Sequence, residues 1–491
     1  MSIKIYNSFT REKEELIPLE EGHVRMYVCG ITAYDRCHIG HARSAVVFDA
    51  VVRHLRNRGY RVTFVRNFTD IDDKIINRAN EEGISCSELS QREIGHFYED
   101  MDALGILRAD IEPRATEHIP EIIGLIQRLV DRGVAYEAGG DVYFAVEKFP
   151  GYGALSGRNI EDMLAGARIA PGELKRSPGD FALWKAAKPG EPKWESPWGE
   201  GRPGWHIECS AMSMKYLGET LDIHGGGLDL IFPHHENERA QSEAATGSQF
   251  VRVWMHNGFV TIKGDKMSKS LNNFITIQDI LKEYHPEALR LFLLSKHYRS
   301  PLDYSPEAIG ENLAALDRCY NAVAEAERLA EMPVKKKRPV SDTAARAIEE
   351  LNPLRDRFNQ AMDDDFNTAR AIGTLFEAVR SLNRLNDEAG KRPSALYAAP
   401  LKDGVSAIRE TAGVLGILQH DPQEYLRQRN LDALAEAGLD EARLLALIEK
   451  RNAARREKNW AEADRIRDEL MEKNIVLQDG PDGTTWSARR G

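Results

Sequence analysis

The chain has 491 residues, with 66 Lys or Arg against 77 Asp or Glu (formal net charge −11), and 42% of its residues are hydrophobic. This length suggests about three domains, and the composition excludes disordered and collagen-like chains. The longest apolar stretch, residues 45–52, is far shorter than the ~20 residues that span a bilayer. Residues 1–16 lack the apolar core of a secretory signal, and five scattered cysteines do not suggest a disulfide framework. We therefore expect a cytoplasmic protein with no membrane segment, whose thiols bind metal or react.

A β-α-β unit is predicted near the start of the chain. Apolar and polar residues alternate over residues 24–29, and this predicted strand ends at Cys29, before the loop-forming Gly30. Apolar residues at helical spacing over 41–58, closed by Gly59, predict a helix, and residues 61–66 predict a second strand. Such a unit favours a parallel sheet that binds ligands at the C-terminal ends of its strands.

The α/β pattern is interrupted and then resumes. Helices predicted at 73–82 and 120–133 precede residues 135–204, whose Gly, Pro and Trp content indicates an insertion. A strand at 221–224, a flexible turn at 225–227, a helix at 234–247 and a strand at 251–256 follow. We expect an α/β fold in which a Rossmann-type parallel-sheet catalytic domain is split by an insertion.

The second half of the chain is predicted to be helical. From residue 286 nearly every segment has a helical pattern, and the basic residues 335–338 form a linker between two prolines. From about residue 441 a basic helix and a short strand at 475–477 form a final module. We expect an α-helical bundle followed by a small C-terminal mixed α/β module. The basic helix is the best candidate for RNA contact, although a solvated face explains it equally well; its basic residues are Lys450, Arg451, Arg455, Arg456 and Lys458.

Two motifs combine histidines and lysines next to predicted strands. His38-Ile39-Gly40-His41 follows the first strand and opens its helix, where helix-end amides favour a phosphate. Lys266-Met267-Ser268-Lys269-Ser270 places two ammonium groups on a loop after a strand. Each motif alone also fits a chance helix start or a solvated basic loop. Together and in this order they resemble the two signatures of class I aminoacyl-tRNA synthetases.

This resemblance implies that ATP, with Mg²⁺, is a substrate. The attack of an amino-acid carboxylate on the α-phosphate builds negative charge, which pre-aimed cationic donors stabilise. The catalytic donors implied are His38, His41, Lys266 and Lys269. The implied ATP-binding residues are Gly30, Thr32, His38, Gly40, His41, Lys266, Met267, Ser268, Lys269 and Ser270.

A third constellation contains metal-ligand residue types. It comprises Cys29 at a strand end, Cys209, and the pair His234 and Glu238, which are four residues apart on one helical face. Two thiolates, an imidazole and a carboxylate make a plausible zinc set, but only folding could unite them. From spacing alone, a small buried cysteine and a capping histidine remain the simpler interpretation.

Longer strings resemble the cysteinyl-tRNA synthetase family over nearly the whole chain. They span residues 26–32, 67–74, 203–210, 224–227, 232–238, 363–368 and 479–486. The resemblance implies one zinc ion per chain, held by Cys29, Cys209, His234 and Glu238, to which the thiol of L-cysteine coordinates. Zinc prefers a soft thiolate to the hydroxyl of serine, so the metal would supply specificity. The residues implied around the substrate are Thr69, Trp205, His224 and Asp229.

The resemblance also implies a domain order and partners. The expected parts are a catalytic first half (1–119), an insertion near the acceptor end (120–199), a catalytic second half (200–250), the signature loop and stem-contact region (251–315), a tRNA-binding helical bundle (316–420) and an anticodon module (421–491). The expected enzyme is a monomer that joins L-cysteine to tRNA(Cys) through a cysteinyl-adenylate. Two alternatives are an ATP-dependent ligase of cysteine to an amino sugar and a non-catalytic tRNA-binding relative.

Overall fold

The computed structural model describes residues 2–158, 174–266, 274–480 and 483–488. The chain forms two compact units, one of residues 1–309, 356–374 and 414–416, and one of residues 310–355, 375–413 and 417–491. Within the described ranges, no helix is both long and apolar enough to cross a bilayer.

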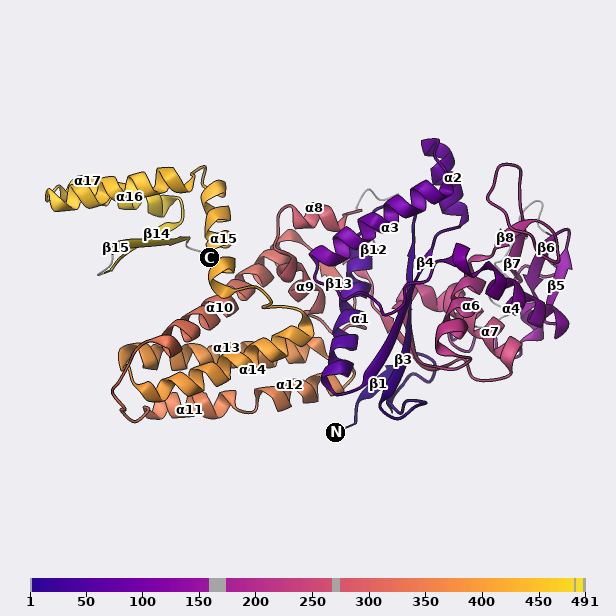
Figure 1. Cartoon of the computed structure of the whole chain (residues 1–491), viewed down its shortest axis with the longest axis horizontal. Helices are drawn as coiled ribbons and strands as arrows, with labels where there is room; N and C mark the ends of the chain where they lie inside the picture. The colour runs from indigo at the N-terminus through magenta and orange to yellow at the C-terminus, as the bar shows by residue number, and fades with distance from the viewer. Residues whose placement is uncertain (1, 159–173, 267–273, 481–482, 489–491) are drawn as a thin grey trace. The chain divides into compact units, whose positions relative to one another are not determined.

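A four-stranded parallel sheet forms the centre of the first unit, in the order β10-β9-β3-β4. Its strands are β3 (His23–Thr32), β4 (Arg61–Thr69), β9 (Leu221–Gly227) and β10 (Val251–Asn257). Helix α1 (Ile39–Asn57) connects β3 to β4 and lies beside them (Figure 1), so the predicted β-α-β unit is confirmed. The predicted strands at 221–224 and 251–256 are confirmed as parts of β9 and β10.

The predicted turn at residues 225–227 is wrong, because these glycines continue β9. Gly225, Gly226 and Gly227 pair in register with residues 255–257 of β10. A Cβ atom on Gly225 would lie 2.4 Å from the Phe48 ring of α1. Gly225 therefore allows helix α1 to pack closely against β9, and the glycines do not reverse the chain.

The predicted insertion contains a sheet of its own, an antiparallel one in the order β5-β6-β7-β8. These strands are β5 (Ala135–Ala138), β6 (Asp141–Phe144), β7 (Phe181–Ala186) and β8 (Gly201–Pro203). Helix α4 (Ile119–Asp131) packs against them through a buried cluster that includes Trp184 and Trp198. Aromatic residues of the insertion thus serve its core.

The first unit contains further helices and short strands. They are β1 (Lys4–Asn7), β2 (Glu12–Glu15), α2 (Asp73–Glu82), α3 (Cys86–Ala103), η1 (Ala115–His118), η2 (Val146–Lys148), α6 (Trp205–Leu217), η3 (Leu228–Leu230), η4 (Ile231–His235), α7 (Glu236–Thr246), β11 (Val260–Ile262), β12 (Asp265–Lys266), α8 (Ile277–Leu281), α9 (Pro286–Leu294) and β13 (Leu302–Tyr304). Strands β12, β11 and β13 form a small sheet after β10.

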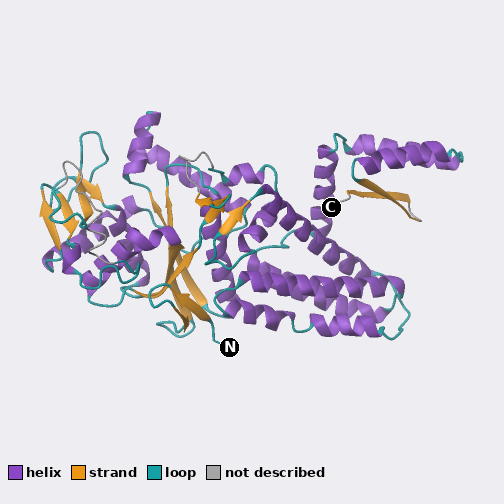
Figure 2. Cartoon of the chain, turned by 180° about the vertical axis from the view of Figure 1, so that it is seen from behind, coloured by secondary structure: helices purple, strands orange, loops and turns teal. Residues whose placement is uncertain are grey.

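The second unit is almost entirely helical, apart from one hairpin at its end (Figure 2). Four helices of this half of the chain, α10, α12, α13 and α14, also have residues in the first unit. The helices of this half are α10 (Pro306–Glu331), α11 (Asp342–Leu351), α12 (Leu354–Asp363), α13 (Thr368–Lys391), η6 (Ala395–Tyr397), α14 (Ala398–Leu415), α15 (Pro422–Glu436), α16 (Glu441–Arg456) and α17 (Trp460–Glu472). Strands β14 (Ile475–Gly480) and β15 (Gly483–Ala488) form the antiparallel hairpin.

The basic helix of the final module differs from the prediction in two ways. Lys458 does not belong to it, because α16 ends at Arg456 and Lys458 has a φ of 61°. Arg451 and Arg455 both pair with Asp479 of β14. These ion pairs join the helix to the hairpin and reduce the positive charge that it offers to RNA.

Candidate functional site

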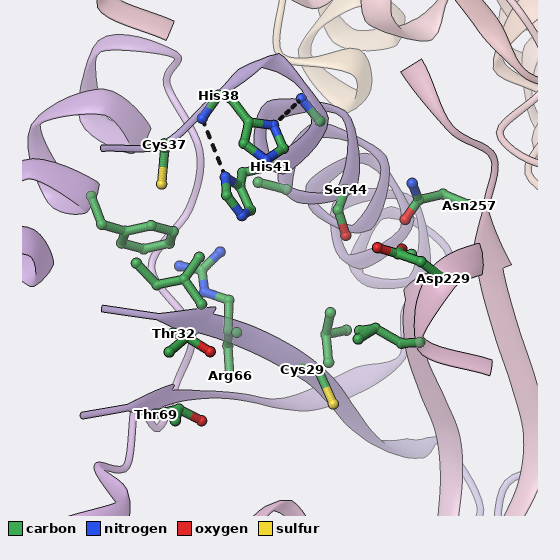
Figure 3. A pocket seen from close by; sticks show the side chains of 18 of the residues that line it. Cys29, Thr32, Cys37, His38, His41, Ser44, Arg66, Thr69, Asp229 and Asn257 are labelled. Carbon is green, nitrogen blue, oxygen red and sulfur yellow. Dashed lines mark hydrogen bonds between the residues drawn. The ribbon is translucent and has the colours of Figure 1, made fainter. Parts of the chain in front are cut away.

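A cavity of about 440 Å³ lies where β3, β4 and β9 end and α1 begins. Among the predicted site residues, those that line it are Cys29, Gly30, Thr32, His38, Gly40, His41, Thr69, Trp205, Cys209, Asp229 and His234. Figure 3 shows His38 and His41 facing the strands that carry Cys29, Thr32 and Thr69. Folding has thus gathered residues from separate motifs at the C-terminal end of the parallel sheet.

The two signature histidines begin helix α1 as a reciprocal cap. Nδ1 of His38 accepts a hydrogen bond from the Gly40 amide (3.0 Å), and Nδ1 of His41 accepts one from the His38 amide (3.2 Å) (Figure 3). An imidazole nitrogen that accepts carries no proton, so each neutral ring carries its proton on Nε2. The capping geometry therefore turns both Nε2 atoms into donors.

The prediction that these histidines are cationic disagrees with their burial. Burial lowers the pKa of His38 to about 4, although the nearby Asp229 carboxylate opposes the shift. Burial, helped by His38 and Lys74, lowers the pKa of His41 to about 3. Both rings are neutral near neutral pH because taking an imidazolium out of water is costly. They donate hydrogen bonds without carrying charge.

Other described side chains that line the cavity are basic, namely Arg36, Arg66 and Lys74. Arg66 of β4 is only 5% exposed, pairs with Glu112 (2.9 Å) and lies over the Phe97 ring. Of the second signature, Lys266 ends β12, and its side chain together with Met267, Ser268, Lys269 and Ser270 falls outside the described part of the chain.

The predicted metal ligands meet beside this cavity. The ligand atoms of Cys29, Cys209, His234 and Glu238 all lie within 4.8 Å of one another. The Cys29 sulfur is 3.8 Å from that of Cys209 and 3.4 Å from Glu238 Oε1, which is 3.0 Å from His234 Nε2. Residues that are 209 positions apart thus form one group with the donor chemistry that suits zinc.

A second set shares part of this group. Cys29 and Glu238 also lie within 4.8 Å of His224 and His235. The second set contains one thiol instead of two, and neither of its histidines lines the cavity. His224 Nε2 is 2.9 Å from Glu238 Oε2, and His235 Nδ1 is 2.8 Å from His256 Nε2. These contacts suit outer residues that orient ligands.

The group is strongly charged when no metal is bound. Burial raises the pKa of the Cys29 thiol well above its ordinary value, whereas the hydrogen bond from Cys29 lowers the pKa of Cys209 to about 6. Burial opposes ionisation of Glu238, but His224 and His234 hold its pKa well below the usual range. Burial also opposes the charge on His234, yet Glu238 and Cys209 raise its pKa to about 10.

The predicted substrate residues occupy different places. Trp205 stacks on His234, with ring centroids 4.3 Å apart. Thr69 is almost fully buried, and its hydroxyl donates to Glu208 Oε2 (2.8 Å). Asp229 lies toward Asn257 (Figure 3). His224 stacks on Trp254 and is not part of the cavity wall, so only the other three can touch a ligand there directly.

Sequence reasoning missed several residues that the fold brings to the site. His235 Nε2 is 3.3 Å from the Cys29 sulfur, and His206 Nδ1 is 3.0 Å from His234 Nδ1. The spacing of His235 from Glu238, one helical turn, is a signal that could have identified it. His256 lies at the end of β10, and ligands bind at the C-terminal ends of parallel strands, so its position could also have identified it. No local pattern identifies Arg66 or Glu208.

Three family models match the chain. Residues 15–314 match the class I (C) tRNA synthetase catalytic domain, residues 357–419 the DALR domain, and residues 437–486 the cysteinyl-tRNA ligase anticodon binding domain. A cysteine–tRNA ligase of Desulfotalea psychrophila is 56% identical over 490 residues, covering 100% of both chains. The chain belongs to the cysteine–tRNA ligase family. Another member, from Syntrophobacter fumaroxidans, is 54% identical and covers 99% of both chains.

Solved structures agree on the class I fold. A methionyl-tRNA synthetase of Mycobacterium tuberculosis, solved with methionyl-adenylate, has a TM-score of 0.61 at 17% identity over 86% of this chain and 96% of that one. A LeuRS of Agrobacterium radiobacter in a ternary complex has a TM-score of 0.58 at 12% identity, over 82% and 85% of the two chains. Class I aminoacyl-tRNA synthetases use ATP, and the Cys/His/Glu group of this member could hold a metal ion.

Proposed function

We propose that this family member activates L-cysteine with ATP, releases pyrophosphate, and transfers the cysteinyl group to the 3′-terminal adenosine of tRNA(Cys). One observation carries the proposal: two thiols, an imidazole and a carboxylate converge beside the cavity whose other wall is formed by His38 and His41. A thiol-binding group and a phosphate-binding helix start thus share one chamber.

The metal is zinc in this proposal, held by Cys29, Cys209, His234 and Glu238. Zinc favours sulfur and nitrogen ligands, and this set offers more sulfur than the one with His224 and His235. When bound, zinc would prefer the thiolate of cysteine to the hydroxyl of serine and would favour loss of the thiol proton. His206 and His224 hold His234 and Glu238 in place through hydrogen bonds.

The protein then contributes orientation and electrostatics to adenylate formation. His38 and His41 donate from Nε2 toward the ATP phosphates, where negative charge grows as the cysteine carboxylate attacks. Because both rings are neutral, the positive charge comes from Lys266 and Lys269 of the second signature, with Arg66 and Lys74 lining the same cavity. The ATP-binding set is completed by Gly30, Thr32, Gly40, Met267, Ser268 and Ser270.

Gly30 is needed because the chain passes close to β4 at this point. A Cβ atom there would lie 1.7 Å from the Asn67 carbonyl oxygen, and the Gly30 amide donates to Asn67 Oδ1 (3.0 Å). Thr69, Trp205 and Asp229 would contact the amino acid, while His224 acts from behind Glu238. The tRNA would be bound by the helical bundle and the final module, in a cytoplasmic monomer.

The test is pyrophosphate exchange into ATP with cysteine and with serine, on protein whose zinc content is measured, followed by charging of tRNA(Cys). Exchange that is specific for cysteine and is lost on zinc removal, followed by charging, is the expected result. Exchange without charging would instead indicate a ligase that joins cysteine to a small amine. No exchange by folded, zinc-loaded protein would contradict the proposal.

A further inference from the structure

Three consecutive aspartates at the junction of α12 and α13 have no part in the proposed function. Asp363 lies 2.9 Å from the Nε2 atom of His54 on α1, and Asp364 pairs with Lys13 of β2 at 2.6 Å. The Asp364 pair is largely exposed, and exposed ion pairs contribute little to stability. Asp365 is fully buried. A buried carboxylate is retained at a cost, so its contacts indicate what it holds.

Asp365 binds the turn formed by residues 297–299, which follows α9. Its Oδ1 accepts hydrogen bonds from the Tyr298 hydroxyl (2.8 Å) and the Tyr6 amide (2.9 Å). Its Oδ2 accepts from Nε (2.9 Å) and Nη2 (2.8 Å) of Arg299. Hydrogen bonds to charged groups are short and strong. The carboxylate therefore fixes the 297–299 turn from two sides.

The 297–299 turn in turn holds the helix of the first signature. Arg43 of α1 is fully buried, and its Nη2 donates to the carbonyls of His297 (3.1 Å) and Tyr298 (3.3 Å). Its Nε and Nη1 have no hydrogen-bond partner among the residues that the structure describes. If the turn moved, the buried guanidinium would lose its acceptors, which is costly. The turn thus restrains Arg43, two residues after His41.

The same turn holds another segment of the cavity wall, residues 257–260. The Gly258 amide donates to the Tyr298 carbonyl (2.8 Å), so this one carbonyl accepts from both α1 and the wall segment. A Cβ atom on Gly258 would lie 2.6 Å from the Ser300 carbonyl oxygen, so the two backbones pass very close to each other. The wall segment continues through β11 into β12, which ends at Lys266 of the second signature.

We propose that Asp365 is a positioning residue for adenylate formation: by holding the 297–299 turn, it fixes the start of α1 relative to residues 257–260. This inference rests on the proposed function, because it assumes that the two signatures act on ATP in the cavity. The proposed metal ligands lie on β3, α6, η4 and α7, whereas the turn follows α9. Loss of Asp365 should therefore affect the reaction of ATP and leave the metal group intact.

The test is Asp365→Asn, compared with the wild type in pyrophosphate exchange. Asp365 has a φ of 63°, which asparagine also adopts readily, so the variant keeps the backbone, the size and one acceptor oxygen. It loses the charge that holds Arg299. Zinc content and urea unfolding are measured on the same samples, so that kcat is expressed per folded, zinc-loaded molecule. Asp364→Asn is the matched control, because it makes the same change at the neighbouring, exposed ion pair.

Asp365→Asn is expected to lower kcat about tenfold to a hundredfold, since a displacement of about 1 Å can cost a hundredfold in rate. The KM for cysteine and the zinc content should stay within about twofold, and Asp364→Asn should change neither of them nor kcat by more than that. An unchanged kcat per folded molecule would overturn the inference. So would an equal loss in Asp364→Asn, or a parallel loss of zinc and of cysteine affinity, which would indicate general loosening of the fold.

A second pair of variants keeps the test decisive if Asp365→Asn does not fold. Arg299→Ala removes the ion pair from the other side and should lower kcat in the same way, whereas Arg299→Lys keeps the charge and should retain more of the rate. Equal loss in both variants would overturn the inference. If the wild type shows no cysteine-dependent exchange, the proposed function fails, whereas exchange that is equal in the wild type and Asp365→Asn refutes only the role of Asp365.

Discussion

Zinc binding to the metal-free protein is expected to release about two protons per site near pH 7.5, since metal ligands must be deprotonated. The pKa values of Cys29 and His234 lie above this pH in the metal-free group, so both residues hold a proton there. The pKa of Cys209, at about 6, and the depressed pKa of Glu238 mean that these two are already ionised. Binding must therefore remove one proton from Cys29 and one from His234.

The sign of the pH dependence follows from this count. The metal-free protein holds more protons than the zinc-bound protein, so the apparent zinc affinity rises with pH, by about two log units per pH unit between about pH 7 and 9. Below the pKa of Cys209, at about 6, a third proton must leave and the dependence becomes steeper. Competition with a chromophoric chelator over a pH series measures the slope, and titration in unbuffered solution measures the protons directly.

A slope near zero would refute this reasoning, because it would mean that the four ligands are already deprotonated before zinc arrives. Cys86→Ser is the matched control. Cys86 is a free thiol outside the metal group, and its substitution should leave both the slope and the affinity unchanged.

Three further predictions concern single substitutions. Cys209→Ser should lower zinc affinity by at least about a hundredfold, which is more than the loss of an outer-shell residue usually causes. Cysteine activation should fall with it. Zinc analysis and pyrophosphate-exchange assays measure the two effects. His38→Ala should keep the zinc and slow adenylate formation about a hundredfold to a thousandfold, because a hydrogen-bond donor to the transition state is lost. Because the pKa of His38 is about 4, the ring is already neutral at pH 6.5, and the wild-type rate should not fall as pH rises through this value. Gly225→Ala should destabilise the protein by about 1–3 kcal/mol in urea unfolding, because the new methyl group meets Phe48.

Each substitution has a control and a contradicting result. Cys37→Ser changes another buried thiol of the cavity and should keep the zinc; equal zinc loss in both cysteine variants would exclude a specific ligand role for Cys209. An unchanged exchange rate in His38→Ala would remove His38 from catalysis. Gly124→Ala introduces a methyl group into open space on α4 and should not destabilise the protein. Equal stability of both glycine variants would show that the Phe48 ring can move aside at little energetic cost.

The local elements of the fold were predictable because their side chains carry periodic patterns. Apolar residues alternate along β3 and repeat at helical spacing along α1, and each element needs only its own sequence to be identified. Residues 225–227 have no side chains to form such a pattern, and their strand depends on the neighbours Phe48 and Met255. Their conformation is therefore decided by packing that local sequence does not contain.

The identity of the candidate ligands could be predicted from residue chemistry and from the resemblance, whereas their protonation states could not. The four proposed ligands converge in the structure. The charge state of His38 and His41 could not be predicted from residue type, because burial lowers the pKa of both rings. Glu208 was missed for a similar reason. Nothing around it in the sequence indicates that its carboxylate meets Thr69, 139 positions earlier.

The position of the metal group in the chain has a consequence for biosynthesis. Cys29 emerges from the ribosome early, whereas Cys209 follows 180 residues later and Glu238 209 residues later. The group is complete only after η4 and α7, which carry His234 and Glu238, have been made, and both follow the insertion in the chain. A nascent chain that stops before β9 thus contains both thiols but neither His234 nor Glu238, so it lacks half of the group. Once bound, the ion would close a loop of more than two hundred residues and oppose separation of the two halves of the parallel sheet.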